Sequence, residues 1–208
     1  MGQRLRRIPL SRRSHIIGFQ PLATGTAEHE SALERDFLVL TSFLDPAASI
    51  TSQPITLKYR DGARVRRYTP DFLVRRSLGH SLLVEVKYRE DLRQHWDRYQ
   101  PAFIAARTWA REQGAMFHFA TERRIRGPRL GNARRLLPLQ RAPVDSQVAA
   151  WVLATVAESD APTFGGVLAA VPAGRRAGLA TIWILIARGA LRVDLSSLIT
   201  MDSRLSLP

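Results

Sequence analysis

Apolar residues recur along the chain with two different periods, and these periods predict where helices and strands lie. From Thr26 onward, Leu33, Phe37 and Leu40 follow one another at spacings of three or four residues, which is the period of one helical face. Thr26 is expected to cap the start of this helix, and Pro46 is expected to end it. The pattern therefore predicts a first helix between these two residues.

Short runs of β-branched and aromatic residues predict strands, and turn residues separate them. Asp61-Gly62 is a hairpin signal because glycine tolerates a positive φ, and Leu78-Gly79-His80 forms a second turn. We expect these strands to form the core of a sheet. They are expected over residues 53–60, 63–68, 68–75 (as a continuation or a neighbour of the previous strand), 81–87 and 115–120.

Residues 91–113 again show a helical pattern, with Pro101 as a candidate break and Gly114 as the end. The apolar side chains available for its buried face are Trp96, Phe103, Ile104 and Trp109. The order of helix, strands, helix and strand predicts an α/β fold in which a mixed sheet is flanked by helices.

The composition changes after Thr121. Helical patterns near residues 144–158, 163–171 and 175–188 precede a short strand at residues 191–194. Helices that end in a small strand are typical of a winged-helix-like module, and also of many other small accessory domains. We therefore expect three parts, namely a basic arm without clear period (1–25), an α/β domain (26–121) and a small, mainly helical domain (122–208).

Charge identifies the class of partner. The chain has 208 residues and a formal net charge of +13, and a polyanion is the simplest partner for such a field. Nucleic acid is the first expectation and an anionic membrane the second, whereas the alternative is a solvated, arginine-rich surface. The charge is clustered in two tracts, and clusters can track phosphates. The tracts are Arg4, Arg6, Arg7, Arg12 and Arg13, and Arg123, Arg124, Arg126, Arg129, Arg134, Arg135 and Arg141.

Composition excludes several other classes of protein. The absence of cysteine removes disulfides, thiolate zinc sites and cysteine nucleophiles. No apolar stretch is long enough to cross a bilayer, so we expect a soluble protein of the bacterial cytoplasm, associated with the nucleoid. The histidines lack zinc-site spacing, and no phosphate-cradling glycine loop is present. The four tryptophans lie on apolar helical faces and are interpreted as core residues rather than base-stacking platforms.

The candidate chemistry lies in two neighbouring strands. Glu85 and Lys87 are two residues apart on a predicted strand, so both side chains leave the same face, opposite Val84 and Val86. Asp71 precedes the apolar run 72–74, and a hairpin return can bring it close to the end of the next strand. The sequence therefore predicts that two carboxylates and one ammonium meet.

Such a group fits phosphodiester hydrolysis with Mg²⁺, for which Mn²⁺ can substitute. Asp71 and Glu85 would supply hard oxygen ligands, and the carbonyl of Val86 is a further candidate ligand. Lys87 would orient or deprotonate the attacking water, or stabilise the developing negative charge. The pattern is that of PD-(D/E)xK nucleases. The alternative is an exposed Glu85–Lys87 pair on a strand, with Pro70-Asp71 as an ordinary turn.

The use of lysine supports the catalytic interpretation. Among the 31 lysines and arginines of the chain, only Lys58 and Lys87 are lysines. An ammonium can shift its pKa and exchange protons, whereas a guanidinium stays charged. A third acid completes many such sites, and the first helix offers Glu28, Glu30, Glu34 and Asp36. Glu34 is the preferred candidate because it lies at the edge of the face that packs on the sheet, and Glu30, one turn earlier, is its rival.

These segments resemble the TnsA family of endonucleases, which act in heteromeric transposases. The resemblance covers roughly residues 26–121, and the tract 121–134 with the helices after it also resembles that family's C-terminal region. The motifs that carry the resemblance are Leu33-Glu34-Arg35-Asp36, Gln53-Pro54, Tyr68-Thr69-Pro70-Asp71-Phe72 and Val84-Glu85-Val86-Lys87. One departure is Glu85, because some members carry glutamine there.

The resemblance implies a restriction-endonuclease-like fold and a catalytic set of Glu34, Asp71, Glu85 and Lys87 with Mg²⁺. Gln53 would be either structural or near the site. The implied substrate is double-stranded DNA at transposon ends, cut at the 5′ ends. The implied partners are a DDE transposase (TnsB-like), which cuts and joins the 3′ ends, and an AAA+ ATPase regulator (TnsC-like). The alternatives are a related nuclease of restriction, recombination or repair, and a non-catalytic DNA-binding assembly protein.

Overall fold

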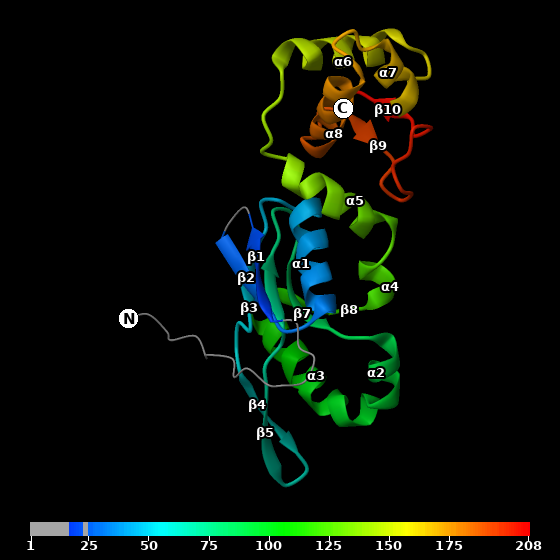
Figure 1. Ribbon diagram of the computed structural model, residues 1–208. Helices are drawn as coiled ribbons and strands as arrows, with labels where there is room; N and C mark the ends of the chain where they lie inside the picture. Colours follow the sequence, from blue (N-terminus) through cyan, green and yellow to red (C-terminus); the bar gives the residue numbers. More distant parts are fainter. Residues whose placement is uncertain (1–16, 23–24) are drawn as a thin grey trace.

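The computed structural model describes residues 17–22 and 25–208, and a four-stranded mixed sheet lies at its centre (Figure 1). Its strand order is β3-β6-β7-β8, with antiparallel pairs between β3, β6 and β7 and a parallel pair between β7 and β8. The strands are β3 (Ser49–Ser52), β6 (Phe72–Arg75), β7 (Ser81–Val86) and β8 (Ala115–Ala120). The predicted mixed sheet flanked by helices is confirmed.

The two faces of the sheet bury different side chains because residues alternate along each strand. Phe72, Val84 and Val86 pack against α1 (Ala32–Leu44) in one apolar cluster. Leu73 and Leu83 point the other way and pack with Ala106 and Ala110 of α3 (Trp96–Glu112). Helices therefore cover both faces, as Figure 1 shows.

The segment before α1 differs from the prediction. β1 (Gly18–Leu22) and β2 (Gly25–His29) pair antiparallel, so a strand lies within the predicted arm and no helix begins at Thr26. The hydroxyl of Ser31, not of Thr26, caps α1 by accepting from the Glu34 N–H at 3.1 Å. Residues 1–16 of the predicted arm, with its five arginines, lie outside the described residues.

The predicted hairpin at Asp61-Gly62 is confirmed, but it does not belong to the central sheet. It consists of β4 (Leu57–Asp61) and β5 (Arg64–Tyr68), which pair only with each other within the described residues and project from the body (Figure 1). The sheet's edge position is taken by β3, a strand that the sequence analysis missed because residues 49–52 are short and mostly polar.

The second predicted helix breaks at His95 instead of Pro101. It forms α2 (Arg89–Gln94) and α3, and Pro101 lies within α3, where only a single backbone hydrogen bond is lost. Phe103 is buried as expected, whereas Ile104 and Trp96 are exposed. The interpretation of all four tryptophans as core residues is therefore wrong for Trp96, and also for the exposed Trp151.

The C-terminal part has its own apolar cluster. It is built from α6 (Ser146–Glu158), α7 (Phe164–Ala170), α8 (Arg175–Ala187) and the antiparallel pair β9 (Arg192–Val193) and β10 (Leu205–Ser206). A further bridge pairs Thr163 with Arg204. Helices thus precede a small two-stranded ribbon in this part, and its winged-helix-like character stays a prediction. None of the helices within residues 17–22 and 25–208 has both the length and the apolar character to cross a bilayer.

Three short elements connect the two parts, namely α4 (Glu122–Ile125), α5 (Pro128–Leu136) and the 3₁₀ turn η1 (Leu137–Leu139). Leu130 and Ala133 of α5 pack in the α1 cluster, whereas Leu136 packs in the C-terminal cluster. On the same helix, the buried Asn132 donates to the carbonyl of Ser197 at 2.8 Å. Because α5 contributes to both clusters, it joins them.

Asp36 holds this junction to α1. The residue is 2% exposed, and its carboxylate accepts from Arg126 Nε at 3.0 Å and from the Arg134 guanidinium. A buried carboxylate is stable only when it is paired and hydrogen-bonded, so α1, α4 and α5 are coupled at this residue.

We expect Asp36→Ala to lower the free energy of unfolding by roughly 2 kcal/mol, because hydrogen bonds to charged groups are lost inside a packed junction. Urea unfolding followed by circular dichroism would measure it. The control is Asp160→Ala, at an exposed position, which should leave the midpoint unchanged. Equal midpoints for the two variants would contradict this role for Asp36.

Candidate active site

Asp71 and Glu85 lie opposite each other at one end of the β6–β7 pair. The antiparallel register pairs Phe72 with Val84, and its continuation by one residue pairs Asp71 with Glu85. Directly opposed residues of antiparallel strands point to the same face, with Cβ atoms about 4.5–5.5 Å apart. Asp71 Oδ2 accepts from the Val86 N–H at 2.7 Å, so the carboxylate bends toward the end of β7.

Glu85 is held on both of its oxygens. It is 3% exposed, its Oε1 accepts from Lys87 Nζ at 2.8 Å, and its Oε2 accepts from the Tyr68 hydroxyl at 2.5 Å. Lys87 also lies over the ring of Tyr99, with Nζ 5.2 Å from the ring centroid. The carboxylate and the ammonium are therefore fixed side by side in an enclosed place.

The predicted third acid lies near this pair. Glu34, on the first turn of α1, accepts from the Glu30 N–H at 2.8 Å and from the Ser31 hydroxyl at 2.8 Å. Its charge is close enough to Asp71 to act on the pKa of that carboxyl. The rival, Glu30, accepts from Gln53 Nε2 at 2.5 Å. Both acids therefore face the site, and Glu34 is the one that acts directly on Asp71.

Gln53 connects the segment before α1 to the start of β6. Its backbone has φ +45°, its N–H donates to the Asp71 carbonyl at 2.8 Å, and its side chain reaches Glu30. A positive φ is strained for a residue with a Cβ, and such strain is found where surrounding structure fixes the backbone. Gln53 therefore positions Asp71 and the start of α1 with respect to each other.

The pKa values show an excess of negative charge. Burial, followed by the charges of Glu85 and Glu34, raises the pKa of Asp71 well above its usual range. Burial also raises the pKa of Glu34. For Lys87, burial acts to lower the pKa, but the adjacent Glu85 outweighs it and the net pKa is raised. Lys87 thus contacts Glu85 and acts on Asp71, whereas His29 acts on Glu34.

This donor set fits a hard divalent cation. Mg²⁺ prefers one or two carboxylates and keeps several waters, and Asp71 and Glu85 provide two carboxylates at one strand end. Within residues 17–22 and 25–208, no three His, Cys, Asp or Glu side chains are gathered as a ready-made metal centre. Binding of Mg²⁺ by the two carboxylates of Asp71 and Glu85 stays a prediction.

The predicted DNA-binding arginines fall into two groups. Arg126 and Arg134 pair with Asp36, and Arg135 lies 4.7 Å from the ring centroid of Trp183. In contrast, Arg129 is exposed on α5, and Arg123 and Arg124 line a hollow beside β8. DNA binding by any of them stays a prediction, but Arg123, Arg124 and Arg129 are exposed and form no ion pair among the residues that the structure describes.

Sequence reasoning missed the roles of Tyr68 and Tyr99, which contact Glu85 and Lys87 respectively. For Tyr68 a signal existed, because it is part of the segment that ends in Asp71. For Tyr99 no local signal existed, since it lies on α3 and meets Lys87 only in the folded chain.

Comparison with known proteins identifies the central part of the chain. The family model described as TnsA-like endonuclease N terminal matches residues 46–122, which include Asp71, Glu85, Val86 and Lys87. The resemblance to TnsA-like endonucleases is confirmed for this segment, and it indicates a DNA endonuclease. Glu34 lies before the matched residues. No curated protein matches the chain.

The raised pKa of Asp71 has a consequence for stability without metal. The folded chain binds more protons than the unfolded chain at pH values between the ordinary and the raised pKa, so stability falls as the pH rises through that window. In Asp71→Asn the amide oxygen can still accept from Val86 and no charge forms. We expect this variant, in EDTA, to gain stability over the parent at pH 8 and to match it near pH 4.

Urea unfolding across this pH range would measure the effect, with Asp202→Asn, an exposed residue, as the control. If the parent and Asp71→Asn showed parallel pH profiles, the raised pKa of Asp71 in the folded protein would be refuted.

Proposed function

We propose that this protein is a Mg²⁺-dependent DNA endonuclease that hydrolyses phosphodiester bonds at the strand end occupied by Asp71, Glu85 and Lys87. The observation that carries the proposal is the opposition of two carboxylates, with an ammonium 2.8 Å from one of them, inside a TnsA-like segment. The net charge of +13 supports a polyanionic substrate.

Mg²⁺, with Mn²⁺ as a substitute, would supply Lewis acidity to a phosphate oxygen and acidify a water. Asp71 and Glu85 would hold it, with the Val86 carbonyl as a further ligand. The Val86 N–H fixes the Asp71 carboxylate, and the Tyr68 hydroxyl fixes that of Glu85. These two contacts orient the oxygens before any ligand arrives, which is the purpose of a preorganised site.

Lys87 would act on the attacking water and on the developing negative charge. Its Nζ is held between Glu85 and the Tyr99 ring, and its side chain is partly exposed, so it can meet a phosphate from the surface. Since Glu85 keeps this amine protonated, stabilising negative charge and orienting the water are favoured over removing a proton. Glu34 is proposed as the third acid, facing Asp71 from α1.

We further propose that the DNA is cleaved at the 5′ ends of a transposon. The match to the TnsA-like endonuclease model supports this, as do the arginine-rich tract and C-terminal helices that follow it. A DDE transposase (TnsB-like) would process the 3′ ends, and an AAA+ ATPase (TnsC-like) would contact the C-terminal part. The runner-up is a related nuclease of restriction, recombination or repair, which shares the same site chemistry.

Two lysines give a matched test of the active site. We expect Lys87→Ala to reduce the rate of Mg²⁺-dependent cleavage at least about 100-fold, because a group that stabilises the transition state is lost. Lys58→Ala, on the exposed β4–β5 hairpin, should cleave like the parent. Asp71→Ala should be as inactive as Lys87→Ala while still binding duplex DNA.

The assay uses labelled duplexes that carry candidate transposon ends, with and without the products of neighbouring genes. Cuts confined to the 5′ ends in the presence of a transposase would support the transposition role. Persistent cleavage by both Asp71→Ala and Lys87→Ala would exclude this active site, and cleavage of unrelated duplexes without partners would favour the runner-up.

Tyr68→Phe tests the support of Glu85. Loss of a hydrogen bond to a metal-binding carboxylate typically weakens metal affinity by about 10–100-fold. We expect a rise of about 10-fold in the Mg²⁺ concentration for half-maximal cleavage, with the rate at saturating Mg²⁺ changed less. Tyr59→Phe, on β4, is the control. A Tyr68→Phe variant with an unchanged Mg²⁺ requirement would show that the contact has no role in metal binding.

A further inference from the structure

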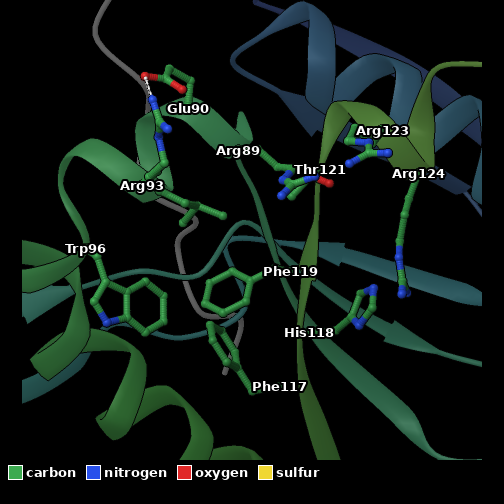
Figure 2. Close-up of a pocket in the computed structure, with 11 residues that line it drawn as sticks. Arg89, Glu90, Arg93, Trp96, Phe117, His118, Phe119, Thr121, Arg123 and Arg124 are labelled. Atoms are coloured by element: carbon green, nitrogen blue, oxygen red, sulfur yellow. Dashed lines mark hydrogen bonds and ion pairs between the residues drawn. The ribbon is translucent and has the colours of Figure 1, made fainter.

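Next to the candidate active site, a large open hollow follows the free edge of β8, and Figure 2 shows the side chains that line it. We call it the β8-edge groove, and the residues used below are Arg89, Arg93, Trp96, Phe119, Arg123 and Arg124. Within the described residues β8 pairs only with β7, so its other edge faces this groove. Its volume is about 1190 Å³, above the ~300–1,000 Å³ of most small-molecule pockets.

The groove starts one strand away from the catalytic residues. The parallel register of β7 and β8 sets Phe119 beside Glu85, and neighbouring strands lie about 4.8 Å apart. Paired residues of parallel strands share a face, so the Phe119 ring lies on the same side of the sheet as the Glu85 carboxylate. From the other direction, Arg89 follows Lys87 by two residues at the start of α2. A strand of DNA at Lys87 therefore has the groove as its next surface.

The aromatic side chains in the groove form a platform with an exposed end. The rings of Trp96 and Phe119 are 6.1 Å apart, and both contact Phe103, at 5.9 and 4.8 Å respectively. Trp96 is nevertheless 42% exposed. Phe103 packs against the ring while solvent reaches its outer part, so a planar group arriving from solvent can stack on it.

The charges around this platform are positive and available. Arg89, Arg123 and Arg124 are exposed, and none of them forms an ion pair with residues 17–22 or 25–208. Arg93 pairs with the exposed Glu90 at 3.0 Å. Figure 2 shows arginines from α2 and from α4 on either side of the rings. This arrangement, with arginines around stacking rings, suits phosphates and bases.

We propose that the β8-edge groove binds unpaired nucleotides that flank the scissile phosphate, with a base stacked on Trp96 and phosphates held by Arg89, Arg123 and Arg124. The inference rests on the proposed endonuclease function. In a duplex, neighbouring base pairs cover the faces of each base, so only a frayed or extruded base presents a face to the tryptophan. An acidic strand of a partner protein would satisfy the arginines but leave the exposed ring without a stacking partner.

The test is a binding experiment in EDTA, so cleavage plays no part. The probes are a blunt duplex and the same duplex with a three-nucleotide single-stranded end, each with 2-aminopurine at the terminal or first unpaired position. We expect the parent to bind the second probe about 10-fold more tightly, the value of one stacked base, and to quench its fluorescence. Trp96→Ala should lose this preference and the quenching, and still bind the blunt duplex.

Trp151→Ala is the matched control, because Trp151 on α6 is 44% exposed and lies outside the groove. It should keep the preference. Trp96→Phe retains a ring and should keep most of the quenching, which separates loss of stacking from loss of folding. Arg124→Gln, at an exposed position, should weaken binding of the single-stranded end and reduce its salt dependence.

Equal affinity of the parent for the two probes would overturn the proposal, as would equal losses in Trp96→Ala and Trp151→Ala. A glutamate-rich decapeptide that displaced the single-stranded probe at lower concentration than unlabelled probe would assign the groove to a protein partner instead. The binding assay needs no metal and no cleavage. Its result therefore does not depend on whether Lys87→Ala is active or inactive. Failure of the endonuclease proposal and failure of this one are therefore distinguishable.

Discussion

Repulsion between carboxyl groups is the constraint on which the active-site end of this molecule depends. The β6–β7 register sets Asp71 opposite Glu85, and α1 adds Glu34 from the side. The Lys87 ammonium, the Tyr68 hydroxyl and the Val86 N–H offset part of the charge on Asp71 and Glu85, and the Glu30 N–H and the Ser31 hydroxyl bind Glu34. Apolar residues at these positions would make the protein more stable, since buried charges that are incompletely paired cost free energy. A divalent cation would balance this negative charge. The incompletely paired carboxylates are therefore the physical basis for proposing that the site is catalytic.

Asp36 is a buried carboxylate whose charge, in contrast, is paired with cations. Asp36, two residues after Glu34 on α1, is fully buried and has two arginine partners. Its charge is satisfied, so it holds helices together instead of attracting a ligand. The same helix therefore presents one acid to the sheet end and another to the α4–α5 junction. This difference in partners separates the two roles, although both residues are acids on one short stretch of helix.

The arginines also divide into those with a structural partner and those that line an open surface. Those that meet Asp36 or Trp183 join α1, α5 and the C-terminal cluster. Those around β8 face an open groove that begins one strand from Lys87. The positive charge of the chain is thus partly structural, while the exposed Arg89, Arg123 and Arg124 line a groove near the proposed catalytic residues. Proximity of this kind lets binding energy for the substrate act where bonds are broken.

The sequence by itself determined the local chemistry. Alternation along residues 82–87 placed Glu85 and Lys87 on one face, and Asp61-Gly62 fixed a hairpin, because both depend on neighbours in the chain. Only the tertiary structure decided that β4 and β5 leave the central sheet, that Trp96 is exposed, and that Arg126 and Arg134 belong to Asp36. These outcomes depend on contacts between residues up to 98 positions apart, where packing and charge pairing override local pattern. Periodicity reports which way a side chain leaves its own element, and it carries no information about what that side chain meets.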